Sequence, residues 1–247
     1  MRGARLAVAA LAALALAPAV ARAQARHSPI SGSFELGATY SYPNMDADFA
    51  PSTTFPLGHG PWEQVFGSRS RWGFRAGISR MVYNKVGTVE LGFRSGFLSA
   101  SGKGFSNMAT DGQPPVWVRS EADTTTFHMI PTSLMATYRF DWAADRVPLV
   151  PYVRLALERY NWWVTDGAGK TSQKGATNGW SATGGLAFLL DWFDPGLARE
   201  LDADSGVNHT YLYFDVTRAK VDDFGSKKSW DLSDKHVAYS AGLLFIY

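Results

Sequence analysis

Apolar and polar residues alternate in several segments of this chain. Between residues 34 and 42, every second residue is apolar, whereas Glu35 and Thr39 lie on the other parity. A period of two is typical of a β-strand whose two faces meet different surroundings. Segments with this pattern are 34–42, 72–78, 89–97, 130–140, 153–157, 182–190, 212–216 and 237–247. The pattern predicts eight strands, or ten if one connection contains a further hairpin.

The connections between these segments alternate between long and short. Segments rich in Gly, Pro, Asp, Ser and Lys are 43–70, 101–125, 163–179 and 222–234, and the short ones are 82–87 and 141–148. Long outer loops and short inner turns are typical of an up-and-down transmembrane barrel. In the exception, 191–207, Asp194 and Pro195 resemble an N-cap and first helical position and Gly206 a stop, which predicts one short periplasmic helix.

The first residues have the three parts of a secretory signal peptide. Arg2 and Arg5 precede an apolar run over 6–20, and small residues follow it at alternate positions. The run is shorter than the roughly 20 residues that span a bilayer, so we expect it to be removed. Cleavage after Ala23 or after Ala25 fits equally well. The prediction is therefore a signal peptide over 1–23 and a single domain over 24–247.

Composition narrows the classes of protein. Removal of residues 1–23 lowers Lys+Arg from 24 to 21 against 22 Asp+Glu, so no basic surplus suggests nucleic acid as a partner. Cysteine is absent, which excludes disulfides, thiolate metal sites and an acylated N-terminal cysteine. No apolar stretch after the signal peptide is long enough for a transmembrane helix, and a closed barrel is the other fold that hydrocarbon tolerates.

A soluble periplasmic calyx of the lipocalin kind would show the same alternation, with the apolar face inside. Two features favour the membrane. Seven glycines lie on the polar face, where they would make room inside a narrow barrel: Gly37, Gly73, Gly77, Gly92, Gly96, Gly185 and Gly242. Aromatic residues lie at both ends of the strands, as in the belts of membrane barrels: Tyr40, Tyr42, Trp72, Tyr160, Trp162, Trp163 and Trp180, and Tyr83, Tyr138, Trp142, Tyr152, Trp192 and Tyr247.

The end of the chain resembles the C-terminal insertion signal of outer-membrane barrels. A polar residue, a glycine and alternating apolar residues that finish on an aromatic occur at Ser240, Gly242, Phe245 and Tyr247. Over the mature chain, the pattern resembles the small eight-stranded outer-membrane barrels of the OmpA and OmpX type. The segments 130–134, 148–152 and 241–245 are also similar to a myxobacterial-type barrel family of unassigned function. These resemblances imply the cell outer membrane, and a barrel-assembly machinery that reads the signal during insertion.

The chain shows no sequence pattern of an enzyme or a metal site. Lipid-modifying barrels combine histidine, serine and a carboxylate. The residues two positions after His59, His128, His209 and His236 include no serine, and no two histidines have the spacing of metal ligands. We therefore expect no enzyme activity, no metal and no cofactor.

The polar face predicts a network of charges inside the barrel. Four acids face four bases there: Glu35, Glu90, Glu158 and Asp215, and Arg75, Arg94, Arg139 and Arg154. Charges removed from water must be paired, and strand neighbours should bring Arg75 and Arg139 toward the carboxylates beside Arg94. The expectation is a monomer in outer-membrane lipid with a plugged lumen, acting as a structural or interaction protein through its extracellular loops. A narrow gated pore for small solutes is the alternative, and the soluble calyx is the third reading.

Overall fold

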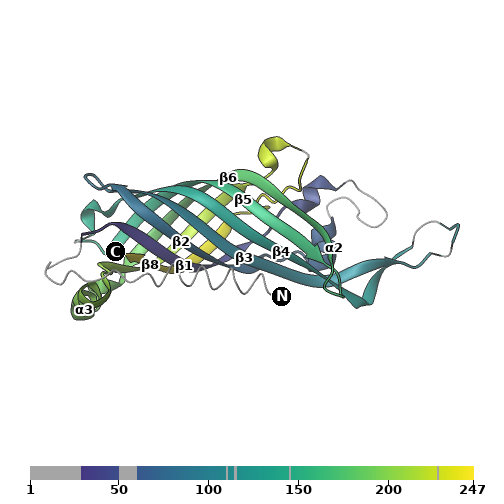
Figure 1. The fold of residues 1–247 in the computed structure, drawn as a ribbon, viewed down its shortest axis with the longest axis horizontal. Coiled ribbons are helices and arrows are strands. Elements are labelled where there is room, and N and C mark those ends of the chain that lie inside the picture. Colours follow the sequence, from purple (N-terminus) through teal and green to yellow (C-terminus); the bar gives the residue numbers. More distant parts are fainter. Residues whose placement is uncertain (1–28, 50–59, 110, 114–115, 145, 227) are drawn as a thin grey trace.

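The computed structural model describes residues 29–49, 60–109, 111–113, 116–144, 146–226 and 228–247. The predicted signal peptide and both cleavage positions lie outside these residues. Eight antiparallel strands form a closed barrel: β1 (Gly32–Ser41), β2 (Arg71–Tyr83), β3 (Thr88–Asn107), β4 (Trp117–Arg139), β5 (Leu149–Thr165), β6 (Thr171–Leu189), β7 (His209–Lys220) and β8 (Ala238–Ile246) (Figure 1). Each strand pairs with its neighbour along the chain, and β8 pairs with β1 to close the ring. The predicted eight-stranded, up-and-down topology is confirmed.

The apolar parity of the strands faces outward. On β5, Leu155 and Leu157 are 65% and 62% exposed, whereas Ala156 between them and Arg154 and Glu158 on either side are buried. The same holds for Phe74 on β2 and Leu134 on β4, which are exposed. Such a continuous apolar outer surface is unfavourable in water and suits hydrocarbon. The barrel therefore has its apolar face outside, as in a membrane protein. The alternative prediction of a soluble calyx with an apolar interior is wrong. Within the described ranges, no helix is long and apolar enough to cross a membrane.

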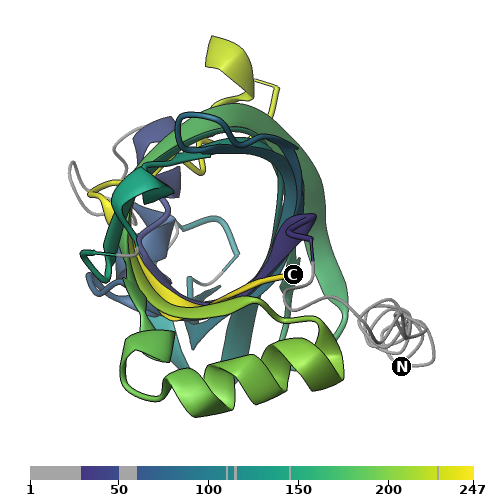
Figure 2. The ribbon, with the colours of Figure 1, turned by 90° about the vertical axis from the view of Figure 1, so that its left-hand side faces the viewer.

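The two ends of the barrel differ in their connections. At one end lie the start of β1, the end of β8 and the segments 84–87, 140–144, 146–148 and 190–208. These segments contain η2 (Asp141–Ala143), η3 (Leu190–Trp192) and α3 (Pro195–Ser205). This end faces the viewer in Figure 2, where α3 lies outside the ring. At the other end lie η1 (Met45–Asp48), α2 (Pro61–Phe66) and η4 (Asp223–Gly225). Since short turns are periplasmic in such barrels, the second end is extracellular.

The predicted periplasmic helix is confirmed as α3. Asp194 is its N-cap, and its Oδ1 accepts hydrogen bonds from the backbone nitrogens of Gly196 and Leu197 at 3.0 and 2.9 Å. Pro195 occupies the first turn, where its missing N–H is not needed. Gly206 ends the helix in the left-handed conformation with φ 71°.

Two predicted loops are largely strand. β3 extends to Asn107 and β4 begins at Trp117, so most of 101–125 is a hairpin that projects beyond the barrel (Figure 1). β5 and β6 extend in the same way to Thr165 and from Thr171. Both faces of such a projecting hairpin meet water, so its sequence carries no apolar alternation, and the segment resembles a loop.

Candidate functional site: the closed lumen

The structure places all eight predicted charges inside the barrel. They come from six strands and face one another across the lumen, and none is more than 8% exposed. The set consists of Glu35 on β1, Arg75 on β2, Glu90 and Arg94 on β3, Arg139 on β4, Arg154 and Glu158 on β5 and Asp215 on β7. The lumen therefore contains a charged layer, a name used below for these eight residues.

Arg154 is the most connected cation of the charged layer. Its Nη2 donates to Glu35 Oε2 at 2.5 Å, and its Nη1 lies 3.8 Å from Asp215 Oδ2. Its Nε donates to the hydroxyl of Thr137 at 3.0 Å. Tyr152 adds a hydrogen bond to Asp215 Oδ2 at 3.0 Å. One guanidinium thus compensates two buried carboxylates from β1 and β7, on opposite sides of β8.

Arg139 and Glu90 form a second pair nearer the periplasmic end. Arg139 Nη1 lies 2.7 Å from Glu90 Oε2, which also accepts from the hydroxyl of Ser33 at 2.8 Å. Arg139 Nε lies 3.8 Å from Asp141, at the periplasmic end of the strands. This contact confirms the predicted approach of Arg139 to Glu90.

The other charges of the layer have partners that strand parity did not predict. Arg94 lies 3.6 Å from Glu35 Oε1 of β1. Arg75 donates to the hydroxyl of Tyr160 at 3.4 Å. Glu158 accepts from the hydroxyls of Ser133 and Ser181 at 2.5 and 2.6 Å rather than from an arginine. Partners in a narrow barrel lie across the lumen, and strand parity alone does not fix that pairing.

Glycines make this crossing possible, as the sequence predicted. Arg75 pairs in register with Gly96, and a Cβ at Gly96 would lie 2.9 Å from Arg75 Cγ. A Cβ at Gly77 would lie 2.9 Å from Glu35 Cγ. Long side chains therefore lie over these glycines on their way into the lumen, where a Cβ would displace them.

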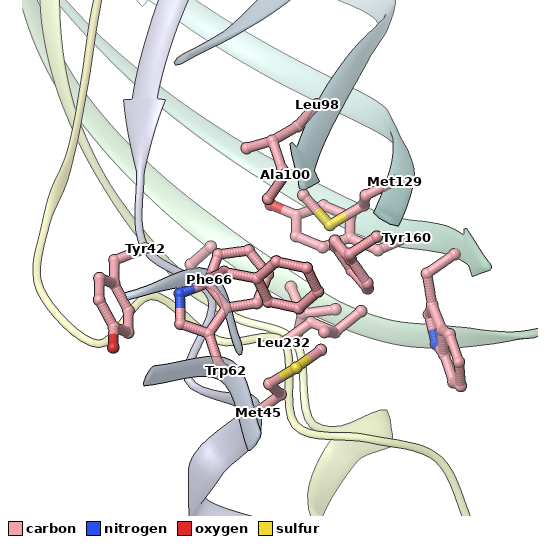
Figure 3. Close-up of a cluster of buried hydrophobic side chains, with 13 residues drawn as sticks. Tyr42, Met45, Trp62, Phe66, Leu98, Ala100, Met129, Tyr160 and Leu232 are labelled. Carbon is pink, nitrogen blue, oxygen red and sulfur yellow. The ribbon is translucent and has the colours of Figure 1, made fainter. Parts of the chain in front are cut away.

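An apolar plug closes the extracellular mouth above the charged layer. It is formed by 13 buried residues: Tyr42, Met45, Trp62, Phe66, Leu98, Ala100, Phe127, Met129, Tyr160, Trp162, Ala219, Val221 and Leu232 (Figure 3). Trp62 of α2 is fully buried and meets Phe127 of β4 edge-on at 5.4 Å. Trp162 stacks on Trp230 at 4.0 Å. Parts of the β1–β2 and β7–β8 connections, including α2, thus pack into the mouth of the barrel.

Asp46 holds α2 in this plug. Its carboxylate accepts from the backbone nitrogens of Trp62 at 2.6 Å and Glu63 at 3.1 Å, at the start of the helix. Burial raises the pKa of Asp46 above its usual range. Sequence reasoning missed the plug, because Trp62 and Phe66 are isolated apolar residues without periodicity in a segment predicted to be loop.

Four aromatic residues predicted for the membrane belts lie inside instead. Tyr42, Tyr160 and Trp162 belong to the plug, and Tyr152 to a periplasmic cluster. On β5 the reason is parity, since 152, 160 and 162 share the inward face of Arg154. Several others occupy the outer surface as predicted, including Trp72, Trp142 and Trp192.

A second apolar cluster closes the periplasmic side of the lumen. Its buried residues are Val150, Tyr152, Ala187, Tyr211, Tyr213, Leu244 and Ile246. The void between this cluster and the charged layer leaves about 10 Å³ for the centre of a water molecule, the size of a single water site. Glu35, Glu90 and Arg154 line it. Side chains therefore leave little space at this level of the lumen.

Two histidines of the described residues contact hydroxyl or carboxylate groups. Ser99 Oγ lies 3.2 Å from His128 Nδ1 across the β3–β4 ladder, and Thr165 Oγ1 lies 3.5 Å from His128 Nε2. The ring of His128 stacks on Trp163 at 5.1 Å. Spacing along the chain could not reveal this cross-strand pair. His209 contacts Asp191 at 2.8 Å, and His59 lies outside the described residues. No group of three potential metal ligands occurs in the described part of the chain.

The C-terminal residues form the seam that closes the barrel. Ser240 donates to Thr39 at 3.3 Å, and Phe245 stacks on Phe34 at 6.4 Å. The backbone carbonyl of Tyr247 accepts from the nitrogens of Ser31 and Gly32 at 2.6 and 2.9 Å. A Cβ at Gly242 would lie 2.0 Å from the carbonyl oxygen of Leu36. The predicted insertion signal is thus also the β8–β1 interface.

These features define the class of protein. A closed ring of eight antiparallel strands, an apolar outer face and a charged, glycine-lined interior are those of a small outer-membrane β-barrel. The protein is located in the outer membrane.

No protein-family model and no curated protein matches the chain. Among solved structures, it is similar to Neisserial surface protein A, with 12% identity, a TM-score of 0.42, and coverage of 88% of this chain and 97% of that chain. It is similar to the attachment invasion locus protein Ail of Yersinia pestis, with 10% identity, a TM-score of 0.40, and coverage of 90% and 99%. It is also similar to the outer membrane protein OprG of Pseudomonas aeruginosa, with 9% identity, a TM-score of 0.44, and coverage of 90% and 97%.

Proposed function

We propose that the protein is a non-conducting, non-catalytic barrel that acts as a structural or interaction protein through its extracellular loops. The layered lumen is the main support for this proposal. A charged layer lies between two apolar clusters, and three of its four arginines form ion pairs with three of its four carboxylates. An ion that entered would have to break these pairs without water to replace them, which costs several kcal/mol per unpaired charge.

The extracellular end supplies the surface for an interaction. The β3–β4 hairpin projects beyond the barrel, and the β5–β6 hairpin ends in an exposed turn over Asp166–Lys170 (Figure 1). Loops carried on a rigid barrel are a common location for binding. We propose that the barrel is a monomer in contact with outer-membrane lipid, inserted by the barrel-assembly machinery, and that nucleic acid is not a partner.

A narrow gated pore is the second candidate. It is favoured by the long distances of two ion pairs, Arg94–Glu35 at 3.6 Å and Arg154–Asp215 at 3.8 Å. The Nε and Nη2 atoms of Arg94 also have no hydrogen-bond partner among the described residues. Such pairs could exchange partners when the plug moves.

Planar-bilayer recording separates the two candidates. We expect the purified protein to give no discrete conductance steps. A variant with Trp62→Ala and Phe66→Ala, which loosens the plug, should also be silent because the charged layer remains. Steps from the unaltered protein would reject the non-conducting proposal, and steps from the variant alone would favour the gated pore.

Protease treatment of intact cells tests the exposed loops. Trypsin should cut after Lys170 at the tip of the β5–β6 hairpin without opening the outer membrane. Cleavage at Arg199 on α3 should require permeabilised cells, since α3 lies at the periplasmic end. If trypsin does not cleave after Lys170 in intact cells, the β5–β6 turn is not exposed on the cell surface, which contradicts the proposal.

A further inference from the structure

The outward face of β5 and β7 carries basic residues directly beyond the apolar band, at the extracellular end. On β5, Arg159 follows the exposed Leu157 by two positions. On β7, Arg218 follows Val216 by two positions, and Lys220 follows Arg218. Arg159, Arg218 and Lys220 are all exposed. They therefore lie where the hydrocarbon region gives way to headgroups.

The sheet register brings these three residues together around one strand. Arg159 pairs with Asn178, Lys220 with Trp180, and Arg218 with Ala182. Their three partners are successive outward residues of β6. Directly opposed residues lie about 5 Å apart and diagonal ones about 7–8 Å. Arg159, Arg218, Lys220 and Trp180 thus form one surface, called the basic patch below.

Strands β3 and β4 differ from β5 and β7 at the corresponding positions. On β3 the residues that follow the outward Phe97 are Ser99 and Ser101, and on β4 the corresponding residues are His128 and Thr126. Lys103 lies further out, and its amine donates to the backbone carbonyl of Glu121 at 2.6 Å. Exposed cations at these positions are therefore more numerous on β5 and β7 than on β3 and β4.

The η4 element overhangs the basic patch. It projects outward from the ring beside β6 (Figure 2). Asn178 Nδ2 fixes it by donating to Asp223 Oδ1 at 2.9 Å. Asp223 and Phe224 have φ values of 53° and 57°, a left-handed conformation that is unfavourable for side chains of this kind. This conformation leaves the ring of Phe224 66% exposed. Backbone strain at non-glycine residues clusters at sites that bind ligands.

The exposed cations of the basic patch suit phosphate. Lys220 lies 3.6 Å from Asp222, and Arg159 donates to Asn178 at 3.1 Å through one nitrogen only. Arg159 and Arg218 are exposed residues of the outward face. Arginine binds phosphate oxygens through two parallel hydrogen bonds, and aromatic rings beside it prefer the boundary between apolar and polar phases.

We propose that the basic patch binds the phosphate groups of a phosphorylated glycolipid in the outer leaflet. Arg159, Arg218 and Lys220 contact the phosphates from the barrel wall, and Trp180 and Phe224 contact the adjoining apolar part of the lipid. The site needs no opening of the lumen, so it is independent of whether the barrel conducts.

Native mass spectrometry of the folded mature protein, released from detergent, tests this proposal. The probes are bisphosphorylated lipid A, dephosphorylated lipid A and phosphatidylglycerol. The variant is Arg159→Gln with Arg218→Gln and Lys220→Gln. The matched control is Arg80→Gln with Lys85→Gln and Arg199→Gln, which removes three exposed cations at the periplasmic end. Equal unfolding midpoints for both variants and the unaltered protein establish that the fold is kept.

We expect the patch variant to bind bisphosphorylated lipid A about tenfold more weakly or worse, and the control to bind like the unaltered protein. Removal of the phosphates from the lipid should weaken binding to the unaltered protein by a similar factor. Equal weakening in both variants would show a general charge effect and overturn the site. Equally tight binding of phosphatidylglycerol would overturn the assignment to a glycolipid.

Discussion

Among single residues, Arg154 forms the most ion pairs with carboxylates of the charged layer. Its guanidinium contacts Glu35 and Asp215. We predict that Arg154→Ala destabilises the folded barrel by about 3–5 kcal/mol, because two buried carboxylates lose their nearest cation. Denaturant titration of the protein in detergent measures this loss as a lower unfolding midpoint.

Arg94→Ala is the matched comparison inside the same layer. Its only ion pair within the described residues is the 3.6 Å contact with Glu35, which keeps Arg154 after the change. The Arg94 variant should therefore unfold at a midpoint between those of the unaltered protein and the Arg154 variant. If Arg94→Ala is the more damaging of the two, the connections drawn for the charged layer are incorrect.

Gly242 and Gly184 have opposite surroundings within the same barrel. A Cβ at Gly242 would meet backbone atoms of Leu36 and Gly37 at 2.0 and 2.5 Å, whereas one at Gly184 would meet nothing within 4 Å. We predict that Gly242→Ala costs about 1–3 kcal/mol through overpacking of the β8–β1 seam. Gly184→Ala should be neutral in the same unfolding measurement. Equal midpoints would show that the seam can move apart without cost.

At the scale of elements, the sequence predicts the strands better than the contacts of the side chains inside the barrel and in its extracellular mouth. Inside the membrane, a strand has one face in lipid and one in the lumen. The alternation of apolar and polar residues therefore identifies each membrane-spanning segment. Beyond the membrane that contrast disappears, which is why the outer parts of β3 and β4 resemble loops in the sequence. The charged layer could be assigned from parity, but the pairing of Arg94 with Glu35 depends on contacts across the lumen. The plug residues Trp62 and Phe66 carry no periodic signal at all.

Strand β8 carries residues that are predicted to act as an insertion signal before the barrel has folded. Phe245 on β8 faces outward and stacks on Phe34, and Phe214 on β7 faces outward and stacks on Tyr239 at 6.2 Å. If Phe245 belongs to an insertion signal, Phe245→Ser should reduce the outer-membrane level and leave exported protein in the periplasm. Phe214→Ser removes an equivalent ring and should have little effect on that level. Cell fractionation and immunoblotting measure the outer-membrane level of both variants. Equal levels of the two variants would show that Phe245 has no role in insertion beyond that of other lipid-facing residues.

At the scale of the whole molecule, the extracellular plug links two distant connections to the barrel wall. Asp234, in the β7–β8 connection, accepts from the backbone nitrogen of Ala219 at 2.9 Å and forms a bridge with Pro43. Burial raises the pKa of Asp234 from 3.8 to about 7, although Arg75 and Arg218 oppose this and Glu158 adds to it. A carboxyl group beside the plug therefore has a pKa near neutral pH.

The sign of this shift predicts a plug that is firmer in acid. Because the folded state binds the proton more tightly than the unfolded state, the contribution of Asp234 is fully present below about pH 4. It is lost as the pH rises to about 7. We expect acrylamide to quench the fluorescence of the plug tryptophans more at pH 8 than at pH 5. Asp234→Asn should remove most of this difference, since the amide oxygen can still accept from Ala219. Asp46, whose pKa is also raised by burial, would account for a remainder of the same sign. Quenching that increases toward acid would mean that Asp234 is ionised in the closed plug and paired with Arg75 or Arg218.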